Sequence, residues 1–571
     1  MREGDDRVGL GIAQRLGLPE MVGRLLASRG VDAELAQHFL EPTLRALLPD
    51  PSVLAGMDAA AERLAHAVMR SETVGVFGDY DVDGACSSAV ITLLLRGLGC
   101  TVLTHVPDRM LEGYGPNAPA LLGLVGRGAG LIVCVDCGTN AGPALLAVAG
   151  SADVIVLDHH ATDGPTPAIV ATVNPNRLDC RSGLGSVCAA AVAFMAAIAT
   201  VRALRRAGYF VGRAEPDLRE LLDLVALATV CDVMPLRGLN RALVVQGLRV
   251  MARRARPGIA ALLEAAAARD VPTAMTCGFA LGPRINAAGR ISDSSLGLRL
   301  LLTDDPVEAR ALAAQLDSTN RDRQEVEAGM MDDAVAQAEA QAASGRAAIL
   351  VHGQGWHAGV VGIVAGRLKE RFNRPVCVAA GVDGAVRGSG RSVAGVDLGR
   401  AVMAARQSGL LSAGGGHAMA AGFALAEGGL GAFHAFLEER LAHAAALPLA
   451  ADLAVEGSIS VGGATVAFAQ ALHRLQPFGN GNEEPAFVLQ RAQVLRADRI
   501  GRDGSTVRAW VAGEGGGPRL KAMLFRAGEG AVAQALLGRG AALHLAGHLR
   551  AEEWNGEVSA SFFVSDAAVA A

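Results

Sequence analysis

The stretch VGVFGDYDVDG, residues 74–84, joins an apolar β-like run to a cluster of aspartates. The same arrangement recurs in LIVCVDCGT (131–139), DVIVLDHH (153–160) and LATVCDVMPL (227–236). Helical patterns lie between the first three runs, and the alternation predicts an α/β domain with a parallel, doubly wound sheet. Residues just past the carboxyl ends of parallel strands gather in one crevice, so the acidic clusters are expected to converge.

These segments supply candidate metal ligands, namely Asp81, Asp83, Asp136, His159 and Asp232. Carboxylates combined with imidazole suit Mn²⁺ or Mg²⁺. Two such ions, bridged by a shared aspartate, assist the attack of water on phosphorus. An aspartate at a strand end is also an ordinary turn or N-cap residue. Four repeats of the pattern, with a His-His pair in one of them, favour the metal site.

The motifs GDYDVDG, VDCGT, DHH and CDVMPL together resemble those of the DHH phosphoesterase superfamily. Further segments narrow the resemblance to the RecJ family of single-strand-specific exonucleases. These segments are LGPRINAAGR (281–290), STNRDRQEVE (318–327), GWHAGVVGIVAGRLKERFNRPV (355–376), RGSGRS (387–392), GGGHAMAAG (414–422), LQPFGNGNEEPAF (475–487) and EWNG (553–556). Because they span nearly the whole chain in order, the series is much stronger than any one of them.

The resemblance implies a metal-dependent exonuclease that degrades single-stranded DNA from the 5′ end to mononucleotides by two-metal-ion hydrolysis, in DNA repair and recombination. It implies that the five side chains named above are the ligands, with Asp83 or Asp136 as the bridge. His160 is expected to contact the scissile phosphate. Asp158 is expected to orient a ligand.

Asp79 belongs with His160 and Asp158 among the catalytic candidates, but its role is left open. Many members of the superfamily have a histidine four residues before the first motif aspartate, where this chain has Phe77. RecJ sequences have GDYD instead. Three interpretations of Asp79 are therefore open: it is a ligand, it orients one, or it leaves that metal more exchangeable.

Candidate substrate-binding residues come from the remaining motifs and from the EGYGPN turn. They are Tyr114, Asn117, Arg284, Asn286, Arg290, Arg321, Gln324, Trp356, His357, Arg387, Ser389, Arg391, Gly415, Gly416 and His417. Arginine grips phosphate, glycine permits close backbone approach, and an aromatic ring stacks on a base. The ordinary alternatives are helix ion pairs for Arg321 and turn packing for Tyr114.

The pattern along the chain predicts five regions. They are a helical segment (1–50), the DHH catalytic domain (51–255), a connecting region with one long helix (256–345), a second α/β, DHH-associated substrate-binding domain (346–447) and a C-terminal OB-fold β-barrel (448–571). The long helix is expected from about residue 306 to 343, where apolar positions recur at helical spacing. The tail changes to short strands separated by Gly and Asp turns.

Composition fits a large cytoplasmic enzyme. No signal segment precedes the first helix, and the uncharged stretch 182–201 is expected to be a buried helix rather than a membrane span. The 9 cysteines lack paired spacing apart from Cys134 and Cys137, which are expected to pack beneath a strand rather than bind zinc. The net charge of −5 leaves open a neutral hydrolase that does not act on nucleic acid.

Two other functions remain open. One is a DHH-family phosphodiesterase for nanoRNA or cyclic dinucleotides, or a pyrophosphatase, whose members generally lack the C-terminal tail seen here. The other is a non-catalytic replication scaffold, which loss of the acidic ligands would mark. The RecJ resemblance implies single-stranded DNA as substrate, and a RecQ-type helicase and single-stranded-DNA-binding protein as partners.

Overall fold

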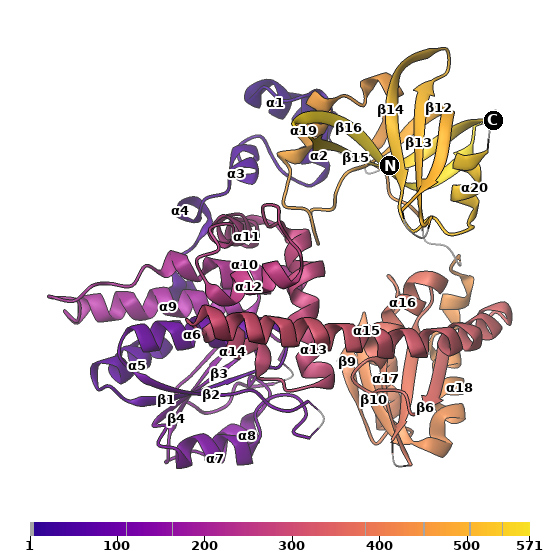
Figure 1. The fold of residues 1–571 in the computed structure, drawn as a ribbon. Helices are drawn as coiled ribbons and strands as arrows, with labels where there is room; N and C mark the ends of the chain where they lie inside the picture. Colours follow the sequence, from indigo (N-terminus) through magenta and orange to yellow (C-terminus); the bar gives the residue numbers. More distant parts are fainter. Residues whose placement is uncertain are drawn as a thin grey trace.

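The structure is a computed structural model that describes residues 5–109, 111–162, 164–382, 384–448, 452–501, 504–538 and 541–570 of the 571-residue chain. A catalytic α/β domain and a second α/β lobe lie at opposite ends of one long helix, α15 (Pro306–Ala343). A β-barrel lies above them in the view of Figure 1. The chain therefore has the predicted α/β class with a C-terminal barrel.

The catalytic domain is built on a five-stranded parallel sheet in the order β2-β1-β3-β4-β5. The strands are β1 (Thr73–Gly78), β2 (Thr101–His105), β3 (Leu131–Val135), β4 (Asp153–Leu157) and β5 (Ala171–Val173). After β2 the chain crosses over β1, and β3 pairs with the edge of β1 opposite to β2. The strand order thus reverses between β1 and β3, which is the point where open α/β sheets bind ligands.

Helices cover both faces of this sheet. One face carries α5 (Met57–Met69), α6 (Val82–Gly97), α9 (Ala189–Arg206) and α10 (Leu222–Cys231), and the other carries α7 (Ala118–Gly126) and α8 (Gly142–Leu146). The domain continues with α11 (Gly238–Met251), α12 (Pro257–Ala265), α13 (Gly282–Ile291) and α14 (Leu296–Leu302). Cys134 and Cys137 are fully buried under the second face, as expected of packing thiols.

The β-like interpretation of the fourth acidic segment is wrong. Residues 222–231 form helix α10, and Asp232 follows a helix rather than a strand. From Leu222 to Thr229 the helix is buried on every side. A helix that is apolar all round shows no helical periodicity, so its sequence cannot be distinguished from a buried strand by pattern alone.

Helix α9 accounts for most of the uncharged stretch 182–201. Almost all of its residues are buried in the core of the catalytic domain. Small alanine side chains let it pack closely against α5 and α6. Across the described ranges, no helix is both long enough and apolar enough to cross a membrane.

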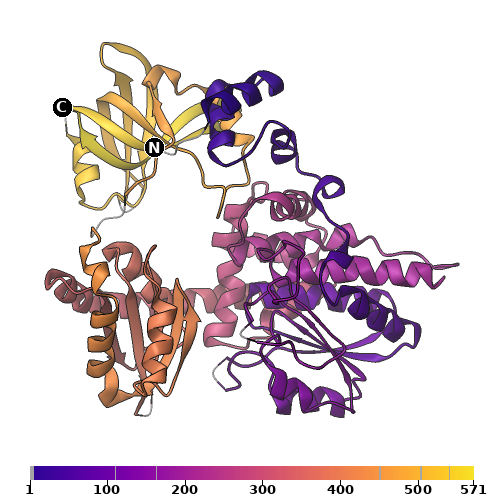
Figure 2. The same ribbon diagram turned by 180° about the vertical axis from the view of Figure 1, so that it is seen from behind.

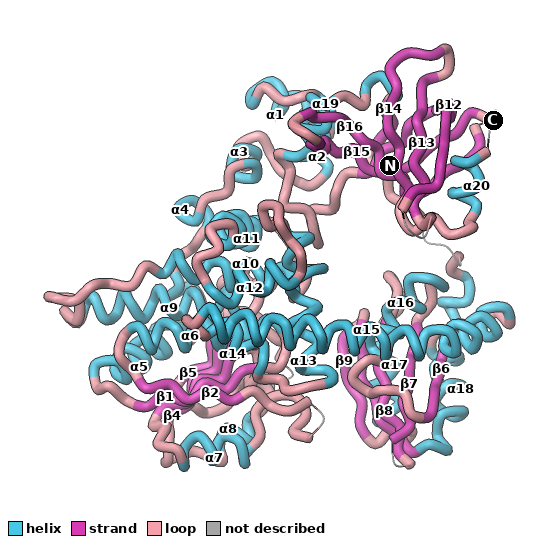
Figure 3. The backbone as a smooth tube through the Cα atoms, in the orientation of Figure 1, coloured by secondary structure: helices cyan, strands magenta, loops and turns pink. Residues whose placement is uncertain are grey.

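The second lobe has a mixed five-stranded sheet in the order β6-β7-β8-β10-β9 (Figure 3). Its strands are β6 (Ile349–Gln354), β7 (Val376–Val382), β8 (Ala385–Arg391), β9 (Ala413–His417) and β10 (Ala420–Ala426). Its helices are α16 (Val361–Phe372), α17 (Leu398–Gln407) and α18 (Leu430–Arg440). The glycine-rich β9 is the edge strand on the side of the catalytic domain.

The C-terminal sheet closes into a barrel because β12 pairs with both β13 and β15. Its elements are β11 (Gly457–Ile459), α19 (Val466–His473), β12 (Ala486–Ile500), β13 (Thr506–Gly513), β14 (Gly516–Leu524), α20 (Ala531–Leu537), β15 (Ala542–Trp554) and β16 (Glu557–Val569). Closure leaves the five main strands without a free edge. This is the predicted OB-like architecture.

The N-terminal helices pack on this barrel, although the whole chain separates the two in sequence (Figure 2). They are α1 (Asp6–Leu16), α2 (Glu20–Ser28) and α3 (Ala36–Leu40), whereas the next helix, α4 (Leu44–Leu47), packs against α11 of the catalytic domain. Ile12, Val22 and Leu26 are fully buried in the same core as Phe487 and Phe562 of the barrel. The N-terminal segment therefore completes the barrel core, an arrangement that its sequence did not predict.

Candidate metal centre

The first acidic segment follows β1 at the reversal point of the sheet. Asp81 caps α6, because its Oδ1 accepts a hydrogen bond from Gly84 N at 3.0 Å. Asp83 lies in the first turn of α6 and is 1% exposed. A Cβ on Gly84 would lie 2.3 Å from the carbonyl oxygen of Asp79, so glycine permits the tight turn that brings these aspartates together.

Asp83 is held by a second helix. Its Oδ2 accepts from Ala189 N at 2.7 Å and its Oδ1 from Ala190 N at 2.8 Å, both at the start of α9. These amides are free donors of the first helical turn. They fix the orientation of the Asp83 carboxylate, whose oxygens keep further lone pairs that can bind a cation.

Asp136 directly follows β3 and adopts a backbone conformation that is uncommon for its type. Its φ is +59°, and its N–H donates to the carbonyl of Leu157 at 3.0 Å. Left-handed residues other than glycine are enriched at functional sites, where the surrounding structure enforces them. The conformation directs a carboxylate with 2% side-chain exposure toward His159.

Asp158 organises the segment after β4. Its Oδ1 accepts from the backbone N–H groups of His159 and His160 and lies 2.8 Å from Nδ1 of His160. Its Oδ2 accepts from Thr139 N at 3.1 Å. The geometry suits the predicted orienting role, since one buried carboxylate fixes both histidines.

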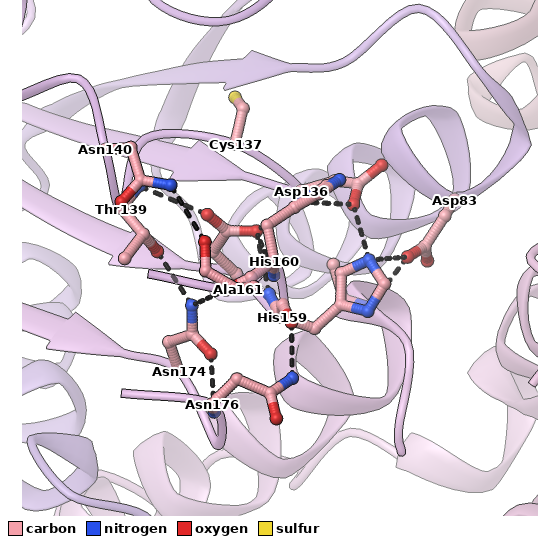
Figure 4. Close-up of polar contacts among 12 residues, drawn as sticks. Asp83, Asp136, Cys137, Thr139, Asn140, His159, His160, Ala161, Asn174 and Asn176 are labelled. Carbon is pink, nitrogen blue, oxygen red and sulfur yellow. Dashed lines mark hydrogen bonds and ion pairs between the residues drawn. The ribbon is translucent and has the colours of Figure 1, made fainter. Parts of the chain in front are cut away.

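Two asparagines that the sequence reasoning missed support the same turn (Figure 4). Asn174 donates to the carbonyl of His160 at 2.9 Å, and Asn176 donates to that of His159 at 2.6 Å. Asn174 also donates to Thr139 Oγ1. The sequence feature that could have identified them is VNPN, in which two asparagines follow the short strand β5.

The candidate ligands converge on His159. Its Nε2 lies 3.3 Å from Asp136 Oδ1, 3.6 Å from Asp232 Oδ2 and 3.8 Å from Asp83 Oδ2. Three overlapping groups have ligand atoms within 4.8 Å of one another: Asp83, His159 and Asp232; Asp136, His159 and His160; and Asp79, Asp81 and Asp136. Asp79 thus lies among the ligands themselves, and Asp136 belongs to two of the groups.

The donor set fits hard divalent cations. Asp79 Oδ1, Asp136 Oδ1 and Asp232 Oδ2 are buried, and none of them has a hydrogen-bond partner among the described residues. Unsatisfied buried oxygens are costly unless a cation or water pairs with them. Carboxylates with imidazole match Mn²⁺ and Mg²⁺, so the residues present fit the two ions that the family resemblance implies.

Burial and mutual repulsion both act on the carboxylates of the centre. Burial raises the pKa of Asp136, and the neighbouring carboxylate of Asp83 raises it further. Burial likewise raises the pKa of Asp79 and of Asp83, and raises that of Asp232 to about 8. A bound divalent cation would favour the ionised forms.

His160 has the opposite surroundings. Burial lowers the pKa of its imidazole, but the hydrogen bond to Asp158, with the negative charges of Asp158, Asp79 and Asp232, raises the pKa to about 9. Asp158 is the complementary partner: burial raises its pKa, whereas the bond to His160 and the amide donors lower it to a net value well below the usual range. The pair therefore favours a charged imidazolium at the rim of the acidic cluster.

Three arginines lie beside this centre. Arg109, in the loop after β2, lies over the ring of Tyr80 with its Cζ 5.0 Å from the ring centroid. Arg290 ends α13 and donates to the carbonyl of Gly359 in the second lobe at 3.1 Å. Arg391 ends β8 and donates to Ser389 Oγ at 2.8 Å. None of the three arginines forms an ion pair with a carboxylate of the described residues.

The three guanidinium groups are close enough to affect one another. Burial, followed by the charges of Arg109 and Arg391, lowers the pKa of Arg290 to about 10. Burial lowers the pKa of Arg391 as well, followed by the charge of Arg109. The start of α16 also reaches this place, since a Cβ on Gly362 would lie 3.1 Å from both Arg391 Nη2 and Ser389 Oγ. Such a cationic cluster at a helix N-terminus suits a phosphate.

The other predicted substrate residues divide into three sets. Tyr114 and Asn286 are in the centre: the Tyr114 hydroxyl donates to the carbonyl of Asp136 at 3.2 Å and lies 3.2 Å from His160 Nδ1, and Asn286 Oδ1 accepts from Val82 N at 3.2 Å. Tyr114 is 55% exposed, so its ring is accessible.

Several candidates have local partners instead. Asn117 caps α7 and donates to Glu112, and Arg284 and Arg321 both pair with Asp317. The helix ion pair considered for Arg321 is therefore present. Gln324 is exposed on α15. For these four residues a substrate role stays a prediction.

The remaining candidates lie in the second lobe. Trp356 packs under Gly353, and His357 Nδ1 accepts from Gly359 N at 3.1 Å beside Arg290. Arg387 and Ser389 are on β8, and Gly415, Gly416 and His417 form the edge strand β9. This group is placed beside the catalytic domain by α15 rather than by contact with the acidic cluster.

Family models match three parts of the chain. They are the DHH family N-terminal domain at residues 73–229, the DHHA1 domain at 344–443 and the RecJ OB domain at 455–566. The single-stranded-DNA-specific exonucleases RecJ of Dickeya dadantii and Escherichia coli are each 40% identical to this chain over 523 residues. Each match covers 89% of this chain and 89% of the relative. The chain belongs to the RecJ family.

Solved RecJ structures agree with this assignment. RecJ of Thermus thermophilus in complex with Mn²⁺ superimposes with a TM-score of 0.82 at 30% identity, covering 100% of this chain and 78% of that one. The same protein in complex with Mg²⁺ gives a TM-score of 0.76 at 29% identity, covering 99% of this chain and 77% of that one. These are the two cations that the donor set fits.

Proposed function

We propose that this chain is a metal-dependent exonuclease that hydrolyses single-stranded DNA from the 5′ end and releases 5′-mononucleotides. The observation that carries the proposal is the convergence of acidic side chains and His159 on one point in a RecJ-family chain, beside a cluster of arginines that pair with no carboxylate among the described residues. The similar proteins are single-stranded-DNA-specific exonucleases, and their activity indicates the substrate.

The metal ligands in this proposal are Asp81, Asp83, Asp136, His159 and Asp232, with Asp79 as a further carboxylate in the same group. Two bound Mn²⁺ or Mg²⁺ ions would supply an activated water and stabilise the attacking and leaving oxygens. Asp136 is in the best position for a bridge, since it belongs to two of the three ligand groups. Asp158 and the two asparagines beneath the histidines keep the donors in place.

His160 is suited to contact the scissile phosphate. Its imidazole is held at Nδ1 by Asp158 and faces the exposed Tyr114 ring. A charged imidazole there stabilises the negative charge that develops on the phosphoryl oxygens. Tyr114, which contacts the same ring, offers a surface for the base of the terminal nucleotide.

The arginine cluster supports cleavage from the 5′ end. Three cations that repel one another, and that pair with no carboxylate in the part of the chain that the structure describes, favour an anion between them. A terminal phosphate carries more negative charge than an internal phosphodiester. No further nucleotide is attached on its 5′ side. Bound at Arg109, Arg290 and Arg391, a 5′-phosphate would leave the first phosphodiester over the metal centre.

Single-strand selectivity follows from the same arrangement. The edge strand β9 with Gly415 and Gly416 faces the catalytic domain from the second lobe. Unpaired nucleotides pass between two lobes more easily than a duplex does, and exposed aromatic side chains of the barrel, Trp510 and Trp554, offer stacking surfaces. The family resemblance alone supplies the rest of the proposal. It implies a cytoplasmic location, a role in DNA repair and recombination, and a RecQ-type helicase and single-stranded-DNA-binding protein as partners.

The test is digestion of a long single-stranded DNA labelled at either end, with Mn²⁺, with EDTA, and with an Asp136→Ala variant. The proposal expects prompt release of a 5′-labelled mononucleotide, late release of the 3′ label, and neither with EDTA or the variant. Earlier release of the 3′ label would refute the polarity. Cleavage of dinucleotides or cyclic dinucleotides, with survival of the long strand, would refute the substrate.

A further inference from the structure

A loop of the barrel domain docks on the segment that follows Asp232. The Asn480 side chain donates to the carbonyl of Val233 at 2.6 Å, across 247 residues of sequence. The backbone carbonyl of Asn480 accepts from Leu236 N at 2.8 Å. Arg237 Nε donates to the carbonyl of Gly481 at 2.7 Å. Both ends of the segment 233–237 are thus hydrogen-bonded to the loop 479–481.

The two segments also fit closely in shape. A Cβ on Gly479 would lie 2.8 Å from Leu236 Cδ1, and a Cβ on Gly481 would lie 3.1 Å from Pro235 Cβ. The φ of Gly481 is +72°, which favours glycine for a second reason. Larger residues at either position would push the loop away from the segment.

The barrel loop is itself rigid. Asn482 is fully buried, and its Nδ2 donates to the carbonyls of Leu475 and Pro477. Arg241 of α11, 1% exposed, donates to the carbonyls of Gln476 at 2.6 Å and Pro477 at 3.3 Å. The loop is therefore anchored to the catalytic domain at its base and presents 479–481 to the segment after Asp232.

The segment that it holds is under conformational strain. Val233 has a φ of +57°, and a β-branched residue there is an outlier. The strain arises where α10 ends: Val233 N donates to Val230 O at 3.1 Å and Met234 N to Thr229 O at 3.1 Å. Strained residues persist when the surrounding structure enforces them, and the bond from Asn480 to the Val233 carbonyl is one such constraint.

Asp232 needs this support more than the other ligands do. Its side chain is 25% exposed, against 1% for Asp83 and 2% for Asp136. Its backbone belongs to the end of a helix instead of the sheet. Beyond the turn that ends the helix, the catalytic domain holds the segment through Asn240, which donates to the carbonyl of Pro235 at 3.1 Å, and through the buried Leu236. The barrel loop supplies the side-chain bond to the carbonyl of Val233, the residue next to Asp232.

We infer that Asn480 is a positioning residue for Asp232, so that the barrel domain completes the metal centre of the catalytic domain. The inference rests on the proposed metal centre and goes beyond it, since it gives the barrel a role in metal affinity besides DNA binding. Asn480 acts through the Val233 carbonyl and touches neither metal nor DNA in this role.

The test measures Mn²⁺ binding by calorimetry on the full chain without DNA. Asn480→Ala, and Asn480→Ala combined with Arg237→Ala, are compared with Gln246→Ala. Gln246 is a matched control because its side-chain amide also donates to a backbone carbonyl far away in sequence, that of Pro42, at 2.7 Å. This bond does not involve residues 232–237. Removing a residue that orients a ligand typically weakens metal binding about 10-fold or more.

The expected result is about 10-fold weaker binding of one Mn²⁺ in Asn480→Ala, a larger loss in the double variant, and no change in Gln246→Ala. Single-stranded DNA affinity in EDTA should be unchanged in Asn480→Ala. Hydrogen exchange should quicken at residues 232–237 in both Asn480 variants.

The outcomes separate the two proposals. If the wild type binds no Mn²⁺, or if Asp232→Ala binds it as well as the wild type, the proposed metal centre fails. If Asp232→Ala loses an ion while both Asn480 variants keep wild-type affinity, only the inference about Asn480 fails. A matching loss of affinity in Gln246→Ala would overturn it too, because the effect would then be one of general destabilisation.

Discussion

The acidic centre and the arginine cluster lie side by side but are built differently. Apart from the barrel loop behind Asp232, the acidic centre belongs to one domain, and backbone amides hold Asp81, Asp83 and Asp158. The arginine cluster takes Arg109 and Arg290 from the catalytic domain and Arg391 from the second lobe. The difference teaches that the acidic centre is held almost entirely by one domain, whereas the arginine cluster exists only where two lobes meet.

The largest effect should come from removing a shared ligand. Asp136→Ala deletes a carboxylate that belongs to two ligand groups, so exonuclease activity should fall about 10³-fold or more, with weaker Mn²⁺ binding. Single-turnover digestion and calorimetry measure the two effects. Glu215→Ala, which breaks an exposed ion pair with Arg205, serves as the control and should keep activity. An active Asp136→Ala enzyme would refute the assignment of the centre.

An intermediate effect should come from the arginine cluster. Arg290→Ala removes a charged donor to the proposed 5′-phosphate, so kcat/KM on 5′-phosphorylated single strands should fall about 10- to 100-fold. Substrates with a 5′-hydroxyl should lose less, and Mn²⁺ affinity should be unchanged. The control is Arg371→Ala, whose exposed guanidinium pairs with Glu339. Equal losses on both substrates would contradict a role in recognising the 5′ end.

The smallest effect should come from the edge strand of the second lobe. Gly415→Ala adds a methyl group into open space, so it should leave stability unchanged but weaken single-stranded DNA binding a few-fold if the backbone approaches the strand closely. Gly416→Ala is the matched comparison, because its Cβ would lie 2.3 Å from Ala420 O at a φ of +149° and should lower the melting temperature. Unchanged DNA affinity in Gly415→Ala would remove β9 from the substrate path.

The sheet and its acidic ends could be predicted because they are local signals. An apolar run followed by Asp identifies a strand end, and parallel strands bring their ends together without further information. The long helix α15 was predictable for the same reason, since its apolar spacing is continuous. Asp232 lies beside His159 as the acidic pattern predicted, although it follows a helix rather than the expected strand, and its role as a ligand stays a prediction.

Contacts between distant segments left no comparable signal. The packing of α1 and α2 on the barrel core depends on the tertiary fold and not on any local pattern. Arg109 was missed because a lone arginine in a loop resembles a solvated one until Arg290 and Arg391 are placed beside it. The bond between Asn480 and Val233 spans 247 residues, and GNGN alone indicates only a turn.

The most direct test of the metal centre is anomalous diffraction at the manganese edge from crystals of the wild-type protein grown with Mn²⁺. The account predicts two peaks within coordination distance of the cluster around His159, with Asp136 contacting both and Asp232 contacting one. Peaks elsewhere in the chain, or a single ion that avoids Asp136, would contradict it.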